Sequence, residues 1–162
     1  MLPALSNGAI DAGIMPEPFL SSGIAQNISK QFRGNGEMFP GQEANLLMFT
    51  GDFAKKKDIA NRFNTARLKG ARDYNDAFFK NIGRDQVVSI LTQQTSVKDP
   101  AVYANLNLAA MNPDGTINPA SLEEEIQWYT KNGIVTNPVD IKQAIDNSFN
   151  EHAVKVLGPY AK

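Results

Sequence analysis

The stretch LPALSNGAIDAGIMPEPF, residues 2–19, decides the predicted fold because it joins a helix end, a turn, an apolar run and an exit through two prolines. Leu2 and Leu5 lie three residues apart, as on one face of a helix, and Asn7-Gly8 is a strong signal for a helix stop followed by a turn. The apolar run at 9–15 is short enough for a buried strand. This order of elements is typical of the edge of a ligand cleft in α/β proteins.

The exit from that strand holds a carboxylate between two prolines. Pro16 and Pro18 cannot donate to a sheet ladder, so they end the strand and keep Glu17 in an extended conformation. Two interpretations of Glu17 stay open. The first is a ligand acceptor for amine or ring N–H donors at the mouth of a cleft, and the second is a hinge carboxylate that accepts backbone N–H groups.

A second strand is expected at 44–50, where the sequence is apolar on both faces and therefore suits the interior of a sheet. Between the two strands we expect a helix fragment at 21–27 and then a loop that is either mobile or lines the cleft. The residues before the second strand, Phe39 and the turn at 40–42, are candidates for stacking on a planar ligand and for presenting backbone N–H groups to it. Plain core packing is the alternative for each phenylalanine, including Phe19.

The rest of the chain predicts packed helices. The longest runs from Asp58, as the cap, to about Phe79, with Ile59, Phe63 and Ala66 on its inner face. Local signals predict the other boundaries. A helix starts at Asp85 and ends before Ser96, Asp99 caps a helix with Pro100 at its first position, and residues 112–115 form a type I turn. Ser121 with Glu124 forms a capping box, and Asp140 with Gln143 forms a second box at the start of the last helix, whose inner face contains Ile141, Ile145, Phe149 and Val156.

Four segments together resemble a known family. They are ALSNGAIDAGIMPEPF at 4–19, PGQEANLLMFTGDFAKK at 40–56, NPDGTINPASLEEEIQWYTKNGIV at 112–135 and VDIKQAIDNSFNEHAVKVLGPY at 139–160. Their order and spacing resemble the nitrate/sulfonate/taurine and thiamine-pyrimidine-precursor group of ABC-transporter substrate-binding proteins.

This resemblance implies an α/β fold of the two-lobed, periplasmic binding protein-like type II class. The chain would be a carboxy-terminal portion, mostly helical with two to three strands. Residues 1–18 would form the end of the second lobe and the crossover, and residues 19–162 the carboxy-terminal part of the first lobe. We therefore expect the chain either to occur with the missing amino-terminal half or to self-associate, with Leu46 and Met48 near the contact.

The function implied by the resemblance is binding of a small organic molecule, such as a pyrimidine or thiamine precursor, a sulfonate or taurine, in the cleft between the lobes. Glu17, Phe19, Phe39, Gly41 and Gln42 are the expected ligand-binding residues. An ABC transporter permease would be the partner. The implied location is bacterial, either periplasmic or extracellular and lipid-anchored, and no signal peptide is visible in this chain.

Three alternatives stay open. A ligand-binding sensor on the same fold would have the same sequence pattern in this half. An enzyme resembling the thiamine-pyrimidine synthases would use a histidine and a cysteine-rich motif, which a chain without cysteine does not supply. The third is a helical interaction module, against which the expected strands at 9–15 and 44–50 argue.

The amino-acid composition argues against nucleic acid as a partner and against membrane-spanning helices. The chain has 162 residues, of which 42% are hydrophobic and 20% charged, as in ordinary globular proteins. Its 16 basic and 17 acidic residues give a formal net charge of −1, so the electrostatic pattern of nucleic-acid binding is missing. No apolar run approaches the roughly 20 residues of a transmembrane helix.

Residues suited to catalysis are scarce. The chain has no cysteine and one histidine, His152, which we interpret as a partly buried surface residue near the inner edge of the last helix. No nucleophile, acid–base pair, phosphate loop or set of metal ligands can be assembled from the sequence. We therefore expect no catalytic residue, no metal, no cofactor and no enzymatic turnover.

Overall fold

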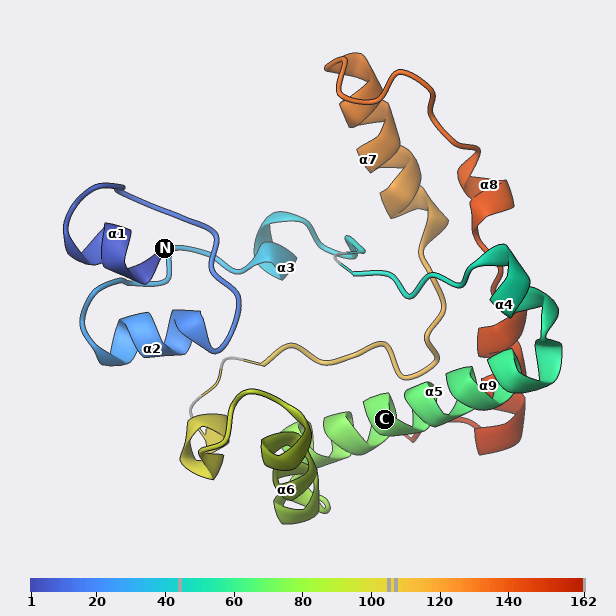
Figure 1. Ribbon diagram of the computed structural model, residues 1–162, viewed down its shortest axis with the longest axis horizontal. Helices are drawn as coiled ribbons and strands as arrows, with labels where there is room; N and C mark the ends of the chain where they lie inside the picture. Colours follow the sequence, from blue (N-terminus) through green and yellow to red (C-terminus); the bar gives the residue numbers. More distant parts are fainter. Residues whose placement is uncertain (44, 105, 107, 162) are drawn as a thin grey trace. The chain divides into compact units, whose positions relative to one another are not determined.

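The computed structural model describes residues 1–43, 45–104, 106 and 108–161, and over these residues the protein is helical (Figure 1). The described part contains nine α-helices and one 3-10 helix. Their bounds are α1 Leu2–Ser6, α2 Phe19–Ala25, α3 Asn35–Met38, α4 Gly51–Lys55, α5 Lys57–Phe79, α6 Arg84–Gln94, η1 Pro100–Ala104, α7 Pro119–Lys131, α8 Ile141–Ala144 and α9 Ser148–Leu157.

The predicted α/β class, with a two-lobed architecture and two to three strands, is wrong. No strand occurs among the described residues, and both expected strands, at 9–15 and at 45–50, are irregular; residue 44 lies outside the described residues. The physical reason is the lack of a partner. An apolar run becomes a strand only when a neighbour satisfies its backbone groups, and here Ile14 and Met48 remain 78% and 84% exposed.

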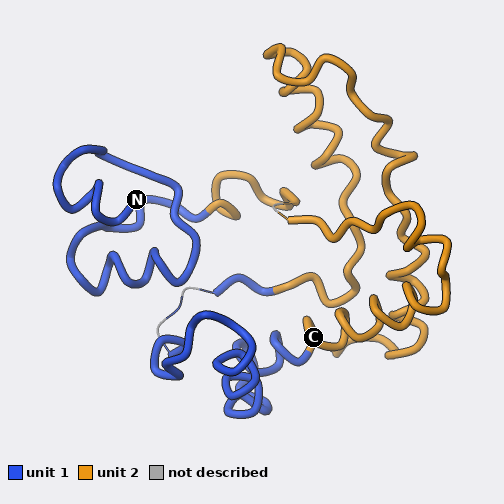
Figure 2. Tube along the Cα trace, in the orientation of Figure 1, with its two compact units in different colours: residues 1–34, 73–110 blue, residues 35–72, 111–162 orange. Residues whose placement is uncertain are grey.

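The chain divides into two compact units, each made of two segments (Figure 2). Unit 1 contains residues 1–34 and 73–110, and unit 2 contains residues 35–72 and 111–162. Helix α5 supplies its first part to unit 2 and its last turns to unit 1. The predicted division of the chain after residue 18 concerned lobes of a larger protein and stays a prediction.

Unit 2 is built around α5 and α9. Phe149 of α9 is buried, and its ring lies 5.1 Å from the ring of Phe49, edge to face. Phe53 and Phe63 also contact Phe49, with ring centroids at 5.0 and 5.9 Å. Edge-to-face aromatic pairs of this kind add to the free energy gained by burial, so this phenylalanine cluster holds α4 and α5 together with α9.

The inner face of α5 differs from the predicted one. Ile59 and Phe63, expected inside, are 51% and 48% exposed, and Ala66 is exposed as well. The buried stripe instead contains Ala60, Asn64 and Leu68, spaced four residues apart. Asn64 is buried because its side chain is hydrogen-bonded, so a polar residue occupies a place where the apolar pattern alone predicts none.

In unit 1, α6 packs against η1. Arg84, at the start of α6, donates from Nη2 to the carbonyl oxygen of Tyr103 over 3.1 Å, and its guanidinium lies 5.2 Å from the ring of Phe78. The Phe78 and Tyr103 rings are 6.4 Å apart. Tyr103 is buried, so it is the anchor that fixes η1 to the end of α5.

Several predicted boundaries are confirmed. Asp99 accepts from the N–H of Ala101 at the start of η1, and the turn at 112–115 closes with a hydrogen bond from the Gly115 N–H to the Asn112 carbonyl. Asp140 also caps α8 as predicted, since its carboxylate accepts from the Lys142 N–H over 3.0 Å; Gln143 Nε2 donates to that carboxylate over 2.9 Å, so the two side chains pair directly in place of the reciprocal bond of a capping box. These boundaries are set by hydrogen bonds between residues that are close in sequence, so the sequence alone can predict them.

Two other boundaries are corrected. Helix α7 begins one turn before the predicted capping box, because Asn118 caps it by accepting from the N–H of Ala120. The predicted last helix is interrupted: α8 ends at Ala144, Ile145 is extended, and α9 starts at Ser148. Asp146 accepts from the Ser148 N–H at this break, so a side-chain acceptor starts a new helix where the apolar pattern predicts a continuous one.

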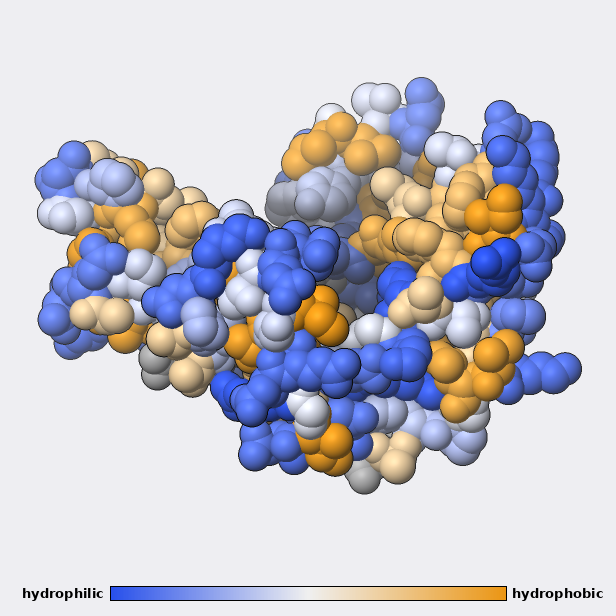
Figure 3. Space-filling view, turned by 60° about the horizontal axis from the view of Figure 1, so that its bottom comes forward, coloured by the Kyte–Doolittle hydropathy of each residue, from blue (hydrophilic) through white to orange (hydrophobic). Residues whose placement is uncertain are grey.

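The surface carries many apolar side chains, which the space-filling view shows in orange on the displayed face (Figure 3). The most exposed large ones are Phe32 at 91%, Met48 and Ile14. Within the described part of the chain, no helix combines the length and the apolar character needed to span a bilayer.

Candidate functional site

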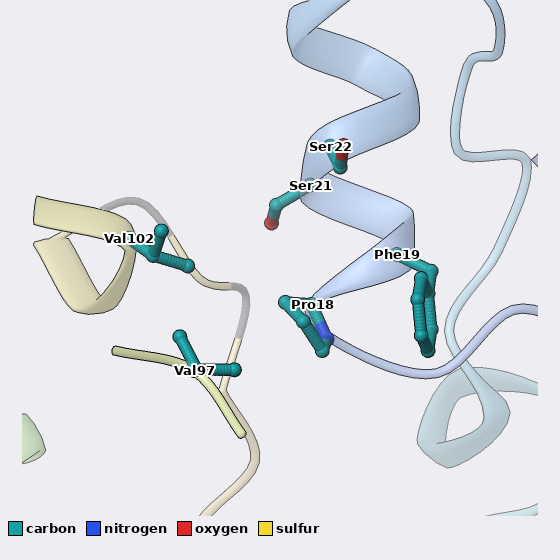
Figure 4. A pocket seen from close by; sticks show the side chains of 6 residues that line it. All are labelled: Pro18, Phe19, Ser21, Ser22, Val97 and Val102. Carbon is teal, nitrogen blue, oxygen red and sulfur yellow. The ribbon is translucent and has the colours of Figure 1, made fainter. Parts of the chain in front are cut away.

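A pocket of about 360 Å³ in unit 1 is the candidate site, and we call it the α2 pocket (Figure 4). One wall comes from the start of α2, and the other comes from η1 and the segment that leads into it. Its lining residues are Pro18, Phe19, Ser21, Ser22, Val97 and Val102. Its volume falls in the range of roughly 300–1,000 Å³ that is usual for small-molecule sites.

The first wall is positioned by Glu17. Its carboxylate accepts hydrogen bonds from the Ser21 N–H over 3.1 Å and from the Ser21 hydroxyl over 2.8 Å. A carboxylate that accepts from an N–H in the first turn stabilises the start of a helix, because that N–H has no partner within the helix. Glu17 therefore fixes the end of α2 that carries Pro18 and Phe19; in Figure 4 Pro18 lies toward Val97 and Val102, whereas the Phe19 ring projects from the other side of the helix.

The second wall is held by Tyr103 and Thr95. The Tyr103 hydroxyl lies 2.9 Å from Thr95 Oγ1 and donates to the Val97 carbonyl over 3.3 Å, while the Val97 N–H donates to Thr95 Oγ1 over 3.2 Å. These bonds fold the chain back between α6 and η1. The valine side chains, Val97 and Val102, then lie on the pocket side (Figure 4).

The lining is apolar apart from two hydroxyls, and none of the six residues is charged. The Ser21 hydroxyl donates to Glu17, and the Ser22 hydroxyl accepts from Gln26 Nε2 over 2.7 Å. Valine, proline and phenylalanine surfaces favour an apolar or planar group, while an uncompensated charge would lose hydration without gaining a partner. The pocket is therefore suited to an uncharged, flat molecule.

Of the five residues predicted to bind a ligand, Phe19 lines the α2 pocket and Glu17 supports its wall through Ser21. The geometry of Glu17 agrees with its interpretation as an acceptor of a backbone N–H. Phe39, Gly41 and Gln42 belong to unit 2. A single concave region that holds both groups stays a prediction.

In unit 2 the segment at 41–43 is attached to the start of α7. Asn118 donates from Nδ2 to the Gly41 carbonyl, and Gln42 Nε2 donates to Glu125 Oε1. Glu43 makes two further bonds: its N–H donates to the Ser121 hydroxyl, and its carboxylate accepts from the Asn118 N–H. Gly41 and Gln42 therefore each make one bond that attaches this segment to α7 or to its cap, and Glu43 makes the other two.

Sequence reasoning missed Ser21 and Ser22 as lining residues, and it also missed both valines. Pro18 was noticed only as a strand breaker. The available signal was the pair of valines on either side of Asp99-Pro100, since a turn between two apolar residues brings both to one side. Nothing in the sequence links that turn to α2, about 80 residues earlier, because the link depends on tertiary packing.

The described residues contain no group of three His, Asp or Glu side chains arranged to hold a metal ion. His152 and Glu151 are both exposed on α9, so the partly buried position expected for His152 near the inner edge of this helix is wrong.

Comparison with family models, with curated proteins and with solved structures found no match to this chain.

Proposed function

We propose that this chain binds a small organic molecule in the α2 pocket, as the solute-binding component of an ABC importer. The observation that carries the proposal is the position of the pocket. It lies at the end of the segment 4–19, where the sequence resembles the solute-binding proteins, and Phe19 of that segment lines it. The permease partner and the location outside the bacterial cytoplasm belong to the same proposal.

The lining favours one class of ligand over the others. A sulfonate or taurine carries a charge that the uncharged walls would leave without a partner. A pyrimidine ring is flat, can lie against the proline and valine surfaces and can use the serine hydroxyls as hydrogen-bonding groups. A pyrimidine precursor is therefore the preferred ligand within this proposal.

Thermal unfolding of the full chain tests this with 4-aminopyrimidine and taurine as probes. We expect 4-aminopyrimidine to stabilise the protein by about 3 kcal/mol at a hundredfold excess over its dissociation constant, and taurine to have no effect. Val102→Trp fills the pocket and should remove the response. Val156→Trp is the matched control, since Val156 is 60% exposed on α9. Stabilisation that survives Val102→Trp would contradict the α2 pocket as the site.

A helical interaction module is the second candidate function. The expected strands argued against it, and the described residues contain none. The large exposed apolar side chains favour it, because such groups mark protein contact surfaces. If a partner protein binds the chain equally well with and without Val102→Trp, while neither small molecule binds, the second candidate is the better one.

A further inference from the structure

The three arginines of α5 differ in their partners, and the difference singles out Arg67. Arg62 pairs with Asp58 and Arg72 pairs with Asp114, at 3.7 and 3.2 Å. Arg67 is half-buried, yet its hydrogen bonds go only to neutral amide oxygens: Nε donates to Asn64 Oδ1 over 2.8 Å and Nη2 to Asn150 Oδ1 over 3.1 Å. Within 1–43, 45–104, 106 and 108–161, no carboxylate pairs with it.

This arrangement leaves a positive charge partly removed from water without an opposite charge. Burial lowers the pKa of Arg67, which is the expected response of a cation that loses hydration. A guanidinium remains charged at every physiological pH, so neutralisation by proton loss is not open to it. A bound anion would supply the opposite charge that the two amide oxygens do not.

The same contacts fix the orientation of the guanidinium. Asn64 and Asn150 are both buried, and Asn64 Nδ2 donates to the Asn150 oxygen over 3.0 Å, so the two amides form a rigid support. Gly115 closes one side: a Cβ added there would lie 2.6 Å from Arg67 Nη2. The hydrogen bonds use Nε and one N–H of Nη2. The second N–H of Nη2 and one N–H of Nη1 point off the outer edge of the guanidinium.

We propose that this edge of Arg67, supported by Asn64 and Asn150, binds a tetrahedral oxyanion such as sulfate or phosphate. An edge of two nitrogen atoms matches two oxygens of such an anion in a bidentate pair. The site belongs to unit 2 alone and does not depend on the α2 pocket.

Titration of the full chain with sodium sulfate and sodium phosphate tests the site, at an ionic strength held constant with sodium chloride. The readout is the Nε–Hε resonance of Arg67, together with calorimetric affinity. We expect a saturable shift, and a dissociation constant at least about tenfold higher in Arg67→Gln. Arg62→Gln is the matched control, because Arg62 is an exposed arginine of the same helix, and its affinity should equal that of the parent. A parallel titration with methyl phosphate shows whether the anion is free or part of an organic ester.

Asn150→Asp provides a second test that does not depend on the folding of Arg67→Gln. It places a carboxylate on Arg67 at the position of the present amide oxygen, so the internal charge should replace the anion and remove the sulfate response. The proposal is overturned if sulfate binds Asn150→Asp as tightly as the parent, if Arg67→Gln and Arg62→Gln bind equally, or if the parent shows no saturable shift.

Discussion

At the scale of single residues, Gly115 shows how closely a loop approaches the buried amide of Asn150 on α9 and the side chain of Leu68 on α5. Its φ is +66°, a value that disfavours any side chain, and an added Cβ would lie 2.8 Å from Asn150 Oδ1 and 3.2 Å from Leu68 Cδ1. Backbone strain and steric overlap therefore coincide at one position. The sequence predicts the turn at 112–115, but this close approach depends on helices that are distant along the chain.

Gly115→Ala is expected to lower the free energy of unfolding by about 1–3 kcal/mol, because the substitution is strained and displaces the amide network. Gly70→Ala is the matched control. Gly70 lies inside α5 with nothing within 4 Å of an added Cβ, so there alanine should stabilise the protein by roughly 0.5–1 kcal/mol through its helix propensity. Urea unfolding measures both, and equal effects of the same sign would contradict the geometry of the loop.

A second prediction at this scale concerns Asp146, at the start of α9. A hydrogen bond from the Ser148 side chain lowers the pKa of this carboxyl below its ordinary value of 3.8. Partial burial acts in the opposite direction and raises the pKa, while the Ser148 N–H and the charge of Lys57 lower it further. A folded-state pKa below the unfolded value contributes stability above the unfolded pKa, and that contribution is lost as the pH falls through the folded pKa.

The parent should therefore be more stable than Asp146→Asn at about pH 6, and the two should converge as the pH is lowered to roughly 2–3. Urea unfolding across this range gives the difference. Asp52→Asn is the control: that carboxylate is 91% exposed and pairs with an equally open Lys55, so its removal should change stability little at any pH. A constant gap between the parent and Asp146→Asn would show that Asp146 does not carry the pH dependence.

At the scale of elements, helix α5 tests which face of a helix the sequence can predict. Leu68→Ala should cost about 2–5 kcal/mol, because Leu68 is fully buried and its truncation leaves a cavity. Ile59→Ala should cost less than about 1 kcal/mol, because half of that side chain is already in water. Chemical unfolding separates the two faces, and a larger loss at Ile59 would restore the face predicted from the apolar pattern.

The elements also show how far local signals reach. The signals at Asp99, Asn112 and Asp140 are confirmed because each bond forms between residues that are close in sequence. The strands expected at 9–15 and 44–50 do not form over the described residues of these runs, because a strand needs a partner that the run itself does not specify. For the candidate site the same limit holds: Phe19 was found from its own segment, whereas Val97 and Val102 belong to a wall formed by tertiary packing.

At the scale of the whole molecule, the exposed apolar surface predicts self-association at micromolar concentration. Met48 is 84% exposed, Leu46 and Leu47 beside it are 41% and 45% exposed, and a formal net charge of −1 gives little repulsion between copies. Met48→Lys should shift the chain toward monomer, because a charge in the contact would lose its hydration. Gln93→Lys adds the same charge at an exposed site of α6 and should leave the association unchanged. Sedimentation velocity measures both variants, and a monomeric parent at these concentrations would refute the predicted contact at 46–48.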